Sequence, residues 1–148
     1  MSAVLTVSQI IERFGDAMTT GKFIRSRWAF ALFGQDTDQL MPRAFAVGVG
    51  ASVIEDFDGR ERYGDQGEAR TTVFVRVASR LRGDAQVPDY REALDHEHDA
   101  VKAALDLDSS LFHTTVVRID RAVTASGEWM ISTIEFVAYH RYSFVRGL

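Results

Sequence analysis

The sequence predicts an α+β fold, a two-layer sandwich in which two helices cover one face of a mainly antiparallel sheet and a long loop or hairpin is exposed. Three observations predict it. Two stretches place apolar residues at helical spacing, several others alternate between apolar and polar residues, and consecutive alternating stretches are close enough for hairpins. The length of 148 residues is typical of one domain, which we assign to residues 1–148.

The first helix is predicted over residues 7–20. Its apolar side chains recur on one face: Ile10, Ile11, Phe14 and Met18. Thr6 or Ser8 can cap the first turn by accepting a backbone N–H. Gly21 suits the left-handed conformation that ends many helices. The helix is therefore expected to pack one apolar face on the sheet.

The next part of the chain predicts two strands with a polar segment between them. Residues 22–43 give no single pattern, because an aromatic stretch that suits a strand runs into a polar loop sequence. Residues 43–57 alternate and place these side chains on one face: Phe45, Val47, Val49, Ala51 and Val53. Residues 58–70 hold three glycines and many charges, which predicts a long exposed loop or hairpin tip. Residues 71–82 alternate again, with Val73, Val75 and Val77 in phase.

The second helix is predicted over residues 88–107, where Pro88 suits the first turn. Its apolar stripe, which also includes His98, consists of Tyr90, Leu94, Val101 and Leu105. The surrounding residues 84–108 carry eight acidic side chains against Arg91 and Lys102. The helix is therefore expected to be strongly acidic on its exposed side.

A final hairpin is predicted from two strands at residues 113–123 and 128–145, joined by a turn at 124–127. The first strand has Val117, Ile119 and Val123 in phase. The expected core face of the last strand comprises Met130, Ile134, Phe136, Ala138, Tyr142 and Phe144. Its other face mixes apolar, aromatic and charged residues: Trp129, Ile131, Glu135, Tyr139 and Arg141.

Composition excludes several classes of protein. The chain has no cysteine, which excludes disulfide frameworks, thiolate zinc sites and cysteine nucleophiles. No apolar run approaches the roughly 20 residues of a membrane-spanning helix, and the first residues have no basic segment of the signal-peptide type, so we expect a cytoplasmic protein. The net charge is −4 and no stripe of lysine and arginine is present, so specific nucleic-acid binding is not expected.

No catalytic, cofactor or metal site is predicted. In the segment DHEHD at 95–99, His96 and His98 are two residues apart on a helix, so they cannot form the i, i+4 pair of a zinc helix. We expect His98 to be half-buried and His96 exposed. The segment GVGAS at 48–52 lacks the following helix of a phosphate loop, so its glycines favour a bulge or a face where another backbone packs closely. His140 is expected in the packed core or at a barrel end.

Two regions are candidates for partner contacts instead. The large aromatics on the mixed face of the last strand, Trp129 and Tyr139, together with Arg141, indicate a partner surface, unless residues 22–43 cover them. The polar loop is either a solvated loop or an arm that pairs with a neighbouring subunit. Its candidate contact residues are Arg60, Glu61, Arg62, Tyr63 and Asp65.

Four stretches of the chain resemble tail terminator (neck) proteins of long-tailed phages and phage-derived particles, of the lambda minor-tail-protein type. They are MPRAFAVGVGA at 41–51, RTTVFVRVASR at 70–80, the helix running from the Leu94–Asp95 step to AAL at 103–105, and FVAYHRYSF at 136–144. The resemblance extends over roughly residues 5–145 and carries no catalytic signature.

This resemblance implies a non-enzymatic virion protein that is assembled in the host cytoplasm. Such proteins form a six-fold homohexameric ring on the last ring of tail-tube subunits, stop tube growth and present a surface to the head–tail connector. DNA passes the central hole without specific binding, and the acidic helix 88–108 and the loop 55–70 are candidates for its lining. The alternative is a small α+β ligand-binding or enzymatic domain with a pocket lined by Trp28, Phe30 and His98.

Overall fold

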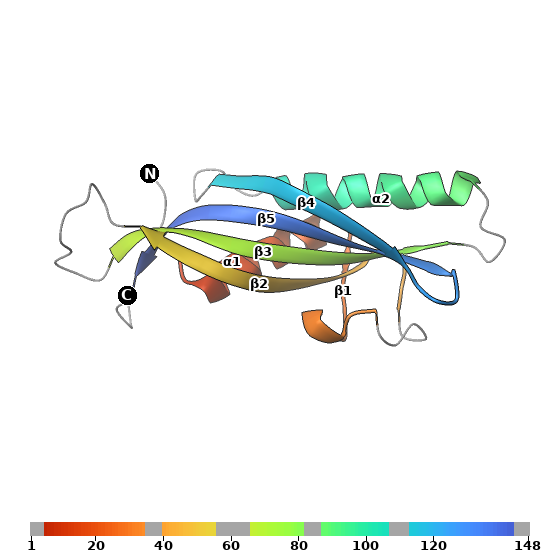
Figure 1. Ribbon diagram of the computed structural model, residues 1–148, viewed down its shortest axis with the longest axis horizontal. Helices are drawn as coiled ribbons and strands as arrows, with labels where there is room; N and C mark the ends of the chain where they lie inside the picture. Colours follow the sequence, from red (N-terminus) through yellow and green to blue (C-terminus); the bar gives the residue numbers. More distant parts are fainter. Residues whose placement is uncertain (1–4, 35–39, 56–65, 82–86, 107–112, 144–148) are drawn as a thin grey trace.

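The computed structural model describes residues 5–34, 40–55, 66–81, 87–106 and 113–143. Two helices, one short 3-10 helix and five strands follow one another along the chain (Figure 1). Their bounds are α1 Val7–Thr20, β1 Ile24–Arg25, η1 Phe30–Leu32, β2 Ala44–Glu55, β3 Gln66–Arg80, α2 Val87–Leu105, β4 His113–Val123 and β5 Trp129–Ser143.

The five strands form one sheet in the order β1-β2-β3-β5-β4. Only β1 is parallel to its neighbour, and β2, β3, β5 and β4 alternate in direction. The predicted α+β class with a mainly antiparallel sheet is confirmed. The outermost long strands are β2 and β4, which lie on opposite sides of the β3–β5 pair (Figure 1).

Helix α1 begins and ends where the sequence predicts. Thr6 accepts a hydrogen bond from the Gln9 backbone N–H at 3.2 Å, and the Gln9 side chain accepts one from the Thr6 backbone N–H at 2.9 Å. This reciprocal capping box satisfies two backbone N–H groups that a helix start leaves without partners. Gly21 closes the other end by donating to Ala17 O at 3.0 Å. Its φ is −77°, so the left-handed conformation predicted for Gly21 is wrong, and Lys22 has a positive φ of 69° instead.

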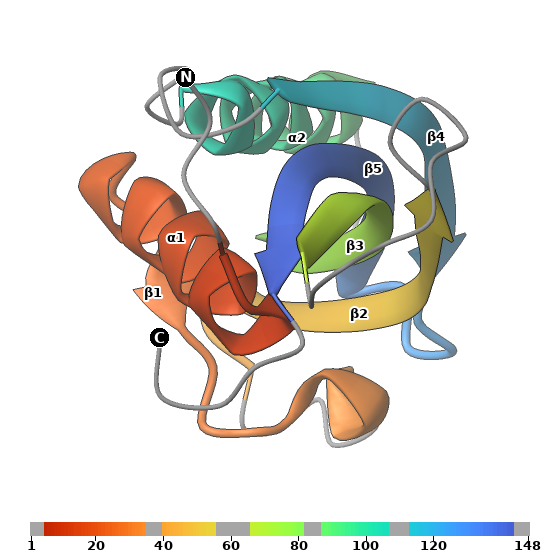
Figure 2. The same ribbon diagram turned by 90° about the vertical axis from the view of Figure 1, so that its left-hand side faces the viewer.

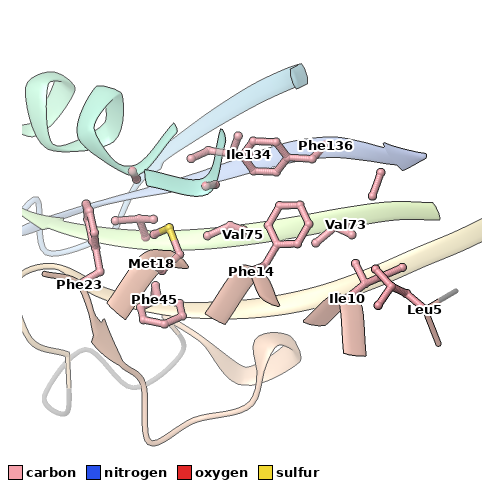
Figure 3. Close-up of a cluster of buried hydrophobic side chains, with 14 residues drawn as sticks. Leu5, Ile10, Phe14, Met18, Phe23, Phe45, Val73, Val75, Ile134 and Phe136 are labelled. Atoms are coloured by element: carbon pink, nitrogen blue, oxygen red, sulfur yellow. The ribbon is translucent and has the colours of Figure 1, made fainter. Parts of the chain in front are cut away.

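The main core brings side chains of both helices together with alternate positions of β3 and β5. Figure 3 shows Phe14 and Met18 extending from α1 towards Val75 and Phe136. The Phe14 and Phe136 rings lie 5.3 Å apart at 54°, a tilted arrangement that aromatic pairs favour. The cluster contains Leu5, Ile10, Phe14, Met18, Phe23, Phe45, Val73, Val75, Val77, Ala100, Ala104, Ile134, Phe136 and Ala138.

The apolar stripe of α2 is not the predicted one. The predicted stripe is partly exposed, since Tyr90 is 44% and Leu105 is 43% accessible. The buried residues of α2 are Ala93, Glu97, Ala100 and Ala104, which also recur at helical spacing. Their small side chains allow the helix backbone to lie close to the sheet, and this close contact outweighs the larger side chains on the neighbouring stripe.

A second cluster forms on the other side of β2, around the region that the sequence left without a pattern. It contains Phe33, Leu40, Ala44, Ala46, Ala78 and Trp129, with Phe30 and Ile131 packed against it. The end-on view shows that η1 lies on the far side of β2 from α2 (Figure 2). The segment around η1 therefore acts as a cover for one part of the sheet, and its aromatic residues supply that cover.

Strand β2 does not keep the alternation that its sequence predicts. Val49 pairs with Val73, but the next matched pair is Ser52 with Thr71, so one extra residue is present in β2. This β-bulge moves Val53 to the face opposite Phe45. The bulge interpretation of the glycines is confirmed. The close neighbour at Gly48 is a side chain rather than the expected backbone, because a Cβ there would lie 2.5 Å from the Phe30 ring.

The β3 strand begins earlier than predicted. Residues 66–70, expected in the exposed loop, form a regular ladder with β5, from Gln66 with Ser143 to Arg70 with Tyr139. Pairing on both sides therefore outweighs the polar local sequence, since strand formation depends more on neighbouring strands than on intrinsic preference. The turn at 124–127 is where predicted, with Gly127 at φ +74°.

Candidate assembly surfaces

The first candidate surface is the outer edge of β2. Strand β1 pairs only with Ala44 and Phe45, so among the described residues the rest of β2 has a partner strand on one side alone. Its second half is exposed, and its large side chains Val49, Val53 and Ile54 are 40%, 49% and 40% accessible. Residues 44–54 contain no charge and no proline. Such an edge can accept another strand, because charges and prolines are what proteins use to prevent edge pairing.

The second candidate surface is the outer edge of β4. This strand pairs only with β5 in the described part of the chain, and most of its residues are exposed. Its exposed aliphatic residues are Val116, Val117 and Val123, at 37%, 54% and 51%. A bulge between Val116 and Arg118 interrupts the predicted alternation, so Val117 is out of phase with Ile119.

The charges of β4 are already compensated within the chain. Arg118 and Asp120 form an ion pair with a closest distance of 3.0 Å. Arg121 donates two hydrogen bonds to Glu97, at 2.6 and 2.7 Å. These contacts leave the strand close to electrically neutral towards an incoming partner.

Glu97 belongs to a three-residue cluster that the sequence did not reveal. It is 4% exposed on α2, and its Oε2 also accepts a hydrogen bond of 2.7 Å from Ser132 on β5. The hydrogen bonds to Glu97 raise the pKa of Arg121 above its ordinary value. A two-point arginine–carboxylate pair of this kind fixes orientation as well as charge, and here it ties α2 to β4 and β5.

The structure also corrects the two neighbouring histidines. His98 is exposed rather than half-buried, while His96 is half-buried, with its Nε2 3.9 Å from Glu92. The buried member of the DHEHD segment is Glu97, because it continues the alanine stripe of α2. Across the described ranges, no group of three metal-binding side chains comes together.

His140 is buried in the core as predicted, at 3% exposure, and ends a chain of hydrogen bonds. Its Nδ1 lies 3.1 Å from the Arg141 carbonyl, which can only accept, so Nδ1 carries the proton. Its Nε2 therefore accepts from the Thr71 hydroxyl at 2.8 Å, and Thr71 in turn accepts from Ser52 at 2.8 Å. Burial lowers the pKa of His140, although the carbonyls of Arg141 and Leu5 oppose that effect.

Of the predicted contact residues, Trp129 is buried and so is not accessible to a partner. It is 3% exposed and is packed against Phe33 and Leu40, so the segment after β1 covers it. Covering a large indole with the chain's own aromatic segment removes it from solvent at no cost of association. Trp129 is therefore a core residue.

The other predicted contact residues lie at the surface or outside the described ranges. Tyr139 is 40% exposed, with its ring 5.9 Å from that of His113, and Arg141 is half-buried. The loop candidates lie outside the described residues: Arg60, Glu61, Arg62, Tyr63 and Asp65.

The predicted aromatic pocket is small and incomplete. Trp28 and Phe30 line an open recess of about 190 Å³ beside Phe45 and Val47, but His98 does not line it. A larger open groove of about 420 Å³ runs between the residues after η1 and strand β4, with Arg76 and Asp120 among its lining residues. The guanidinium of Arg76 is already engaged there by the Phe30 carbonyl at 2.9 Å. Neither hollow brings together a set of catalytic groups.

The described helices include none that is both long and apolar enough to cross a membrane. No known family model matches the chain, and comparison with curated proteins finds no match.

Proposed function

We propose that this chain is a structural ring subunit of the tail terminator type, which caps the head-proximal end of a phage tail tube and joins it to the connector. The observation that carries the proposal is the pair of unlike outer strands. Val49, Val53 and Ile54 are exposed on β2, and Val116, Val117 and Val123 are exposed on β4.

Two different exposed strand edges suit a ring better than a two-fold dimer. In a two-fold dimer the same patch meets itself, whereas a head-to-tail contact joins two different patches and closes when the rotation divides a full turn. The β2 and β4 edges lie on opposite sides of one sheet (Figure 1). Each copy would therefore offer one edge to each neighbour, and the activity would be surface complementarity rather than catalysis.

The exposed acidic side chains of α2 fit passage of DNA without binding. Glu92, Asp95 and Asp99 of α2 are exposed, and so is Asp106 directly after the helix. A surface carrying this charge repels phosphates, and repulsion keeps a passing duplex from adhering. We place this helix on the side of the ring that faces the hole.

The direct test is electron microscopy of the purified chain, alone and mixed with the tube protein of its own tail. We expect rings with a central hole, and tubes whose length stops increasing when the rings cap one end. Tubes that continue to grow in the presence of the folded chain, with no extra density at either end, would overturn the proposal.

The alternative ligand-binding function is tested on the same preparation. A ligand that binds only the folded state at a hundredfold excess over its Kd stabilises it by about 2.7 kcal/mol. A rise in Tm with one metabolite that is abolished by Trp28→Ala would favour the recess beside Phe30 over a purely structural role.

A further inference from the structure

We propose that β2 of one copy pairs with β4 of the next copy as an antiparallel strand pair, so that one sheet continues across the subunit boundary. This inference rests on the proposed function for its partner, a second copy of this chain. It adds the direction, the matched residues and the interface chemistry, which the proposed function leaves open.

The direction follows from the order of the strands. Four long strands alternate in direction across β2, β3, β5 and β4, so β2 and β4 run opposite ways within one copy. We take the ring axis of the proposed assembly to run along the strands, and a rotation about such an axis leaves strand directions unchanged. The neighbour's β4 therefore arrives antiparallel to β2, which is the pairing that the rest of the sheet already uses.

The matched residues follow from the ladders inside one copy. Val49 pairs with Val73, Val73 with Phe136, and Phe136 with Val116, so Val49 and Val116 stand at the same level of the sheet. A closed rotation about that axis moves nothing along it. The same level is therefore restored at the boundary, and Val49 meets Val116 of the next copy.

A second level gives an independent match on the other face of the sheet. Val53 pairs with Arg70, Arg70 with Tyr139, and Tyr139 with His113. Val53 is therefore expected beside His113 of the next copy. Both faces of the sheet then continue across the boundary, because Val49 lies on the Phe136 face and Val53 on the Tyr139 face.

Side-chain chemistry supports the same partner. The β2 edge from residue 44 to 54 carries no charge, and Arg118, Asp120 and Arg121 of β4 are each paired within their own copy. Although these side chains are partly exposed, each keeps its own counter-charge when the two strands approach, so no unpaired charge is buried, which is a main cost of joining polar edges. The exposed aliphatic residues of the two strands would cover one another instead.

The lack of cysteine in this chain makes the test clean, because every crosslink comes from an introduced pair. We would mix Val49→Cys with Val116→Cys under mild oxidation or with a short thiol-reactive linker. Opposed residues of an antiparallel pair have Cβ atoms about 4.5–5.5 Å apart, within reach of such a linker. We expect a shift from the 16.6 kDa chain to a covalent dimer in the mixture and not in either variant alone.

Further cysteine variants control for a misfolded protein and for crosslinks from random collisions. Val53→Cys mixed with His113→Cys probes the other face at the neighbouring level, and should crosslink equally. Lys102→Cys is exposed on α2 and lies on neither edge strand, so it should remain a monomer with every partner. The double variant Val49→Cys/Val116→Cys should give a ladder of covalent oligomers that stops at the number of subunits in the ring.

Each other outcome overturns the inference. Self-crosslinking of Val49→Cys would show a two-fold β2–β2 contact. Absence of crosslinks in both mixtures, while the folded chain assembles or stays monomeric, would show that the edges do not meet. Capped tubes without edge crosslinks would support the proposed function and overturn this inference. Edge crosslinks without capped tubes would support this inference and overturn the proposed function.

Discussion

Of the side chains in the monomer, Glu97 is the one whose removal should lower the free energy of unfolding most. Its carboxylate is 4% exposed and is held by Arg121 and by the buried Ser132 hydroxyl. Glu97→Ala leaves Ser132 without this acceptor and the arginine without its carboxylate. Removing one partner of a buried pair costs about 3–5 kcal/mol, and the partial exposure of Arg121 reduces this to about 2–4 kcal/mol. Urea unfolding measures the difference.

A surface ion pair supplies the matched control. Asp16 and Arg25 lie 3.0 Å apart, with side chains 71% and 56% exposed. Asp16→Ala should cost less than about 1 kcal/mol, because solvent screens exposed pairs. Equal losses in the two variants would mean that Glu97 contributes no more than a solvated carboxylate.

His140 gives a dependence of stability on pH. Burial lowers its pKa below the ordinary value of 6.5, so the folded chain binds a proton more weakly than the unfolded chain. The contribution of His140 to the free energy of unfolding should therefore have its full value above about pH 6.5. It should fall as the pH drops below 6.5 and level off below the pKa of the folded state. The comparison is between the native chain and His140→Gln, in urea titrations from pH 7.5 to pH 5. Parallel curves for the two proteins would contradict this role of His140.

At this scale the sequence predicted the burial of His140 but misplaced the buried residue of α2. The reason is that apolar residues were weighted by size. Tyr90 and Leu105 defined a stripe, whereas the true buried stripe consists of alanines with one glutamate among them. A buried glutamate is rarely predicted, because its partners Arg121 and Ser132 are distant in sequence and are brought together only by the fold.

At the scale of elements, the alanines of α2 determine how closely this helix approaches the sheet. Ala100 is fully buried among Phe23, Val75 and other core residues. Ala100→Leu should push the helix outward and cost about 1–3 kcal/mol, the usual effect of overpacking. Leu105→Ala on the exposed stripe should change the free energy of unfolding by about 0.5 kcal/mol or less. Thermal unfolding of the two variants decides whether the alanine stripe is the packing face.

The bulge and the glycines of β2 allow a second test of packing. Gly48→Ala would place a methyl group against the Phe30 ring, which also receives the Arg76 guanidinium at 4.2 Å. We expect a loss of about 1–3 kcal/mol that becomes smaller when Phe30→Ala is introduced first, as a double-mutant cycle would show. An unchanged loss in the Phe30→Ala background would mean that the ring is not the obstacle.

How far elements could be predicted depended on whether their signal was local. The Thr6 cap of α1 and the turn at 124–127 use neighbouring residues, and both were predicted, whereas the reciprocal contact from the Gln9 side chain was not. The strand at 66–70 could not be, because its full length forms only against β5, more than sixty residues later. Cover of Trp129 by residues 22–43 was one of two predicted alternatives, and the sequence could not decide between them because the contact exists only in the folded chain.

At the scale of the whole molecule, a single charge on an edge strand should prevent assembly and spare the monomer. Val53 is 49% exposed, so Val53→Lys should leave the free energy of unfolding within about 0.5 kcal/mol of the native value. The new ammonium group would lose its water in a strand pair, so the oligomer should be lost. Leu105→Lys, at a position of similar exposure on α2, is the control and should assemble normally. Analytical ultracentrifugation measures both, and an intact oligomer of Val53→Lys would show that β2 is not in the contact.

The position of β5 in the sheet has a consequence for how the protein folds. This strand follows all the others in sequence, yet it lies between β3 and β4. Until it is synthesised, β3 and β4 lack the strand that joins them, and synthesis proceeds at about 5–20 residues per second. The partly made chain therefore exposes open strands for some time, and distant pairings of this kind close slowly. The partly made chain thus has even more open strand edges than the finished one. If copies join through their outer strands as proposed, assembly must wait for the last strand.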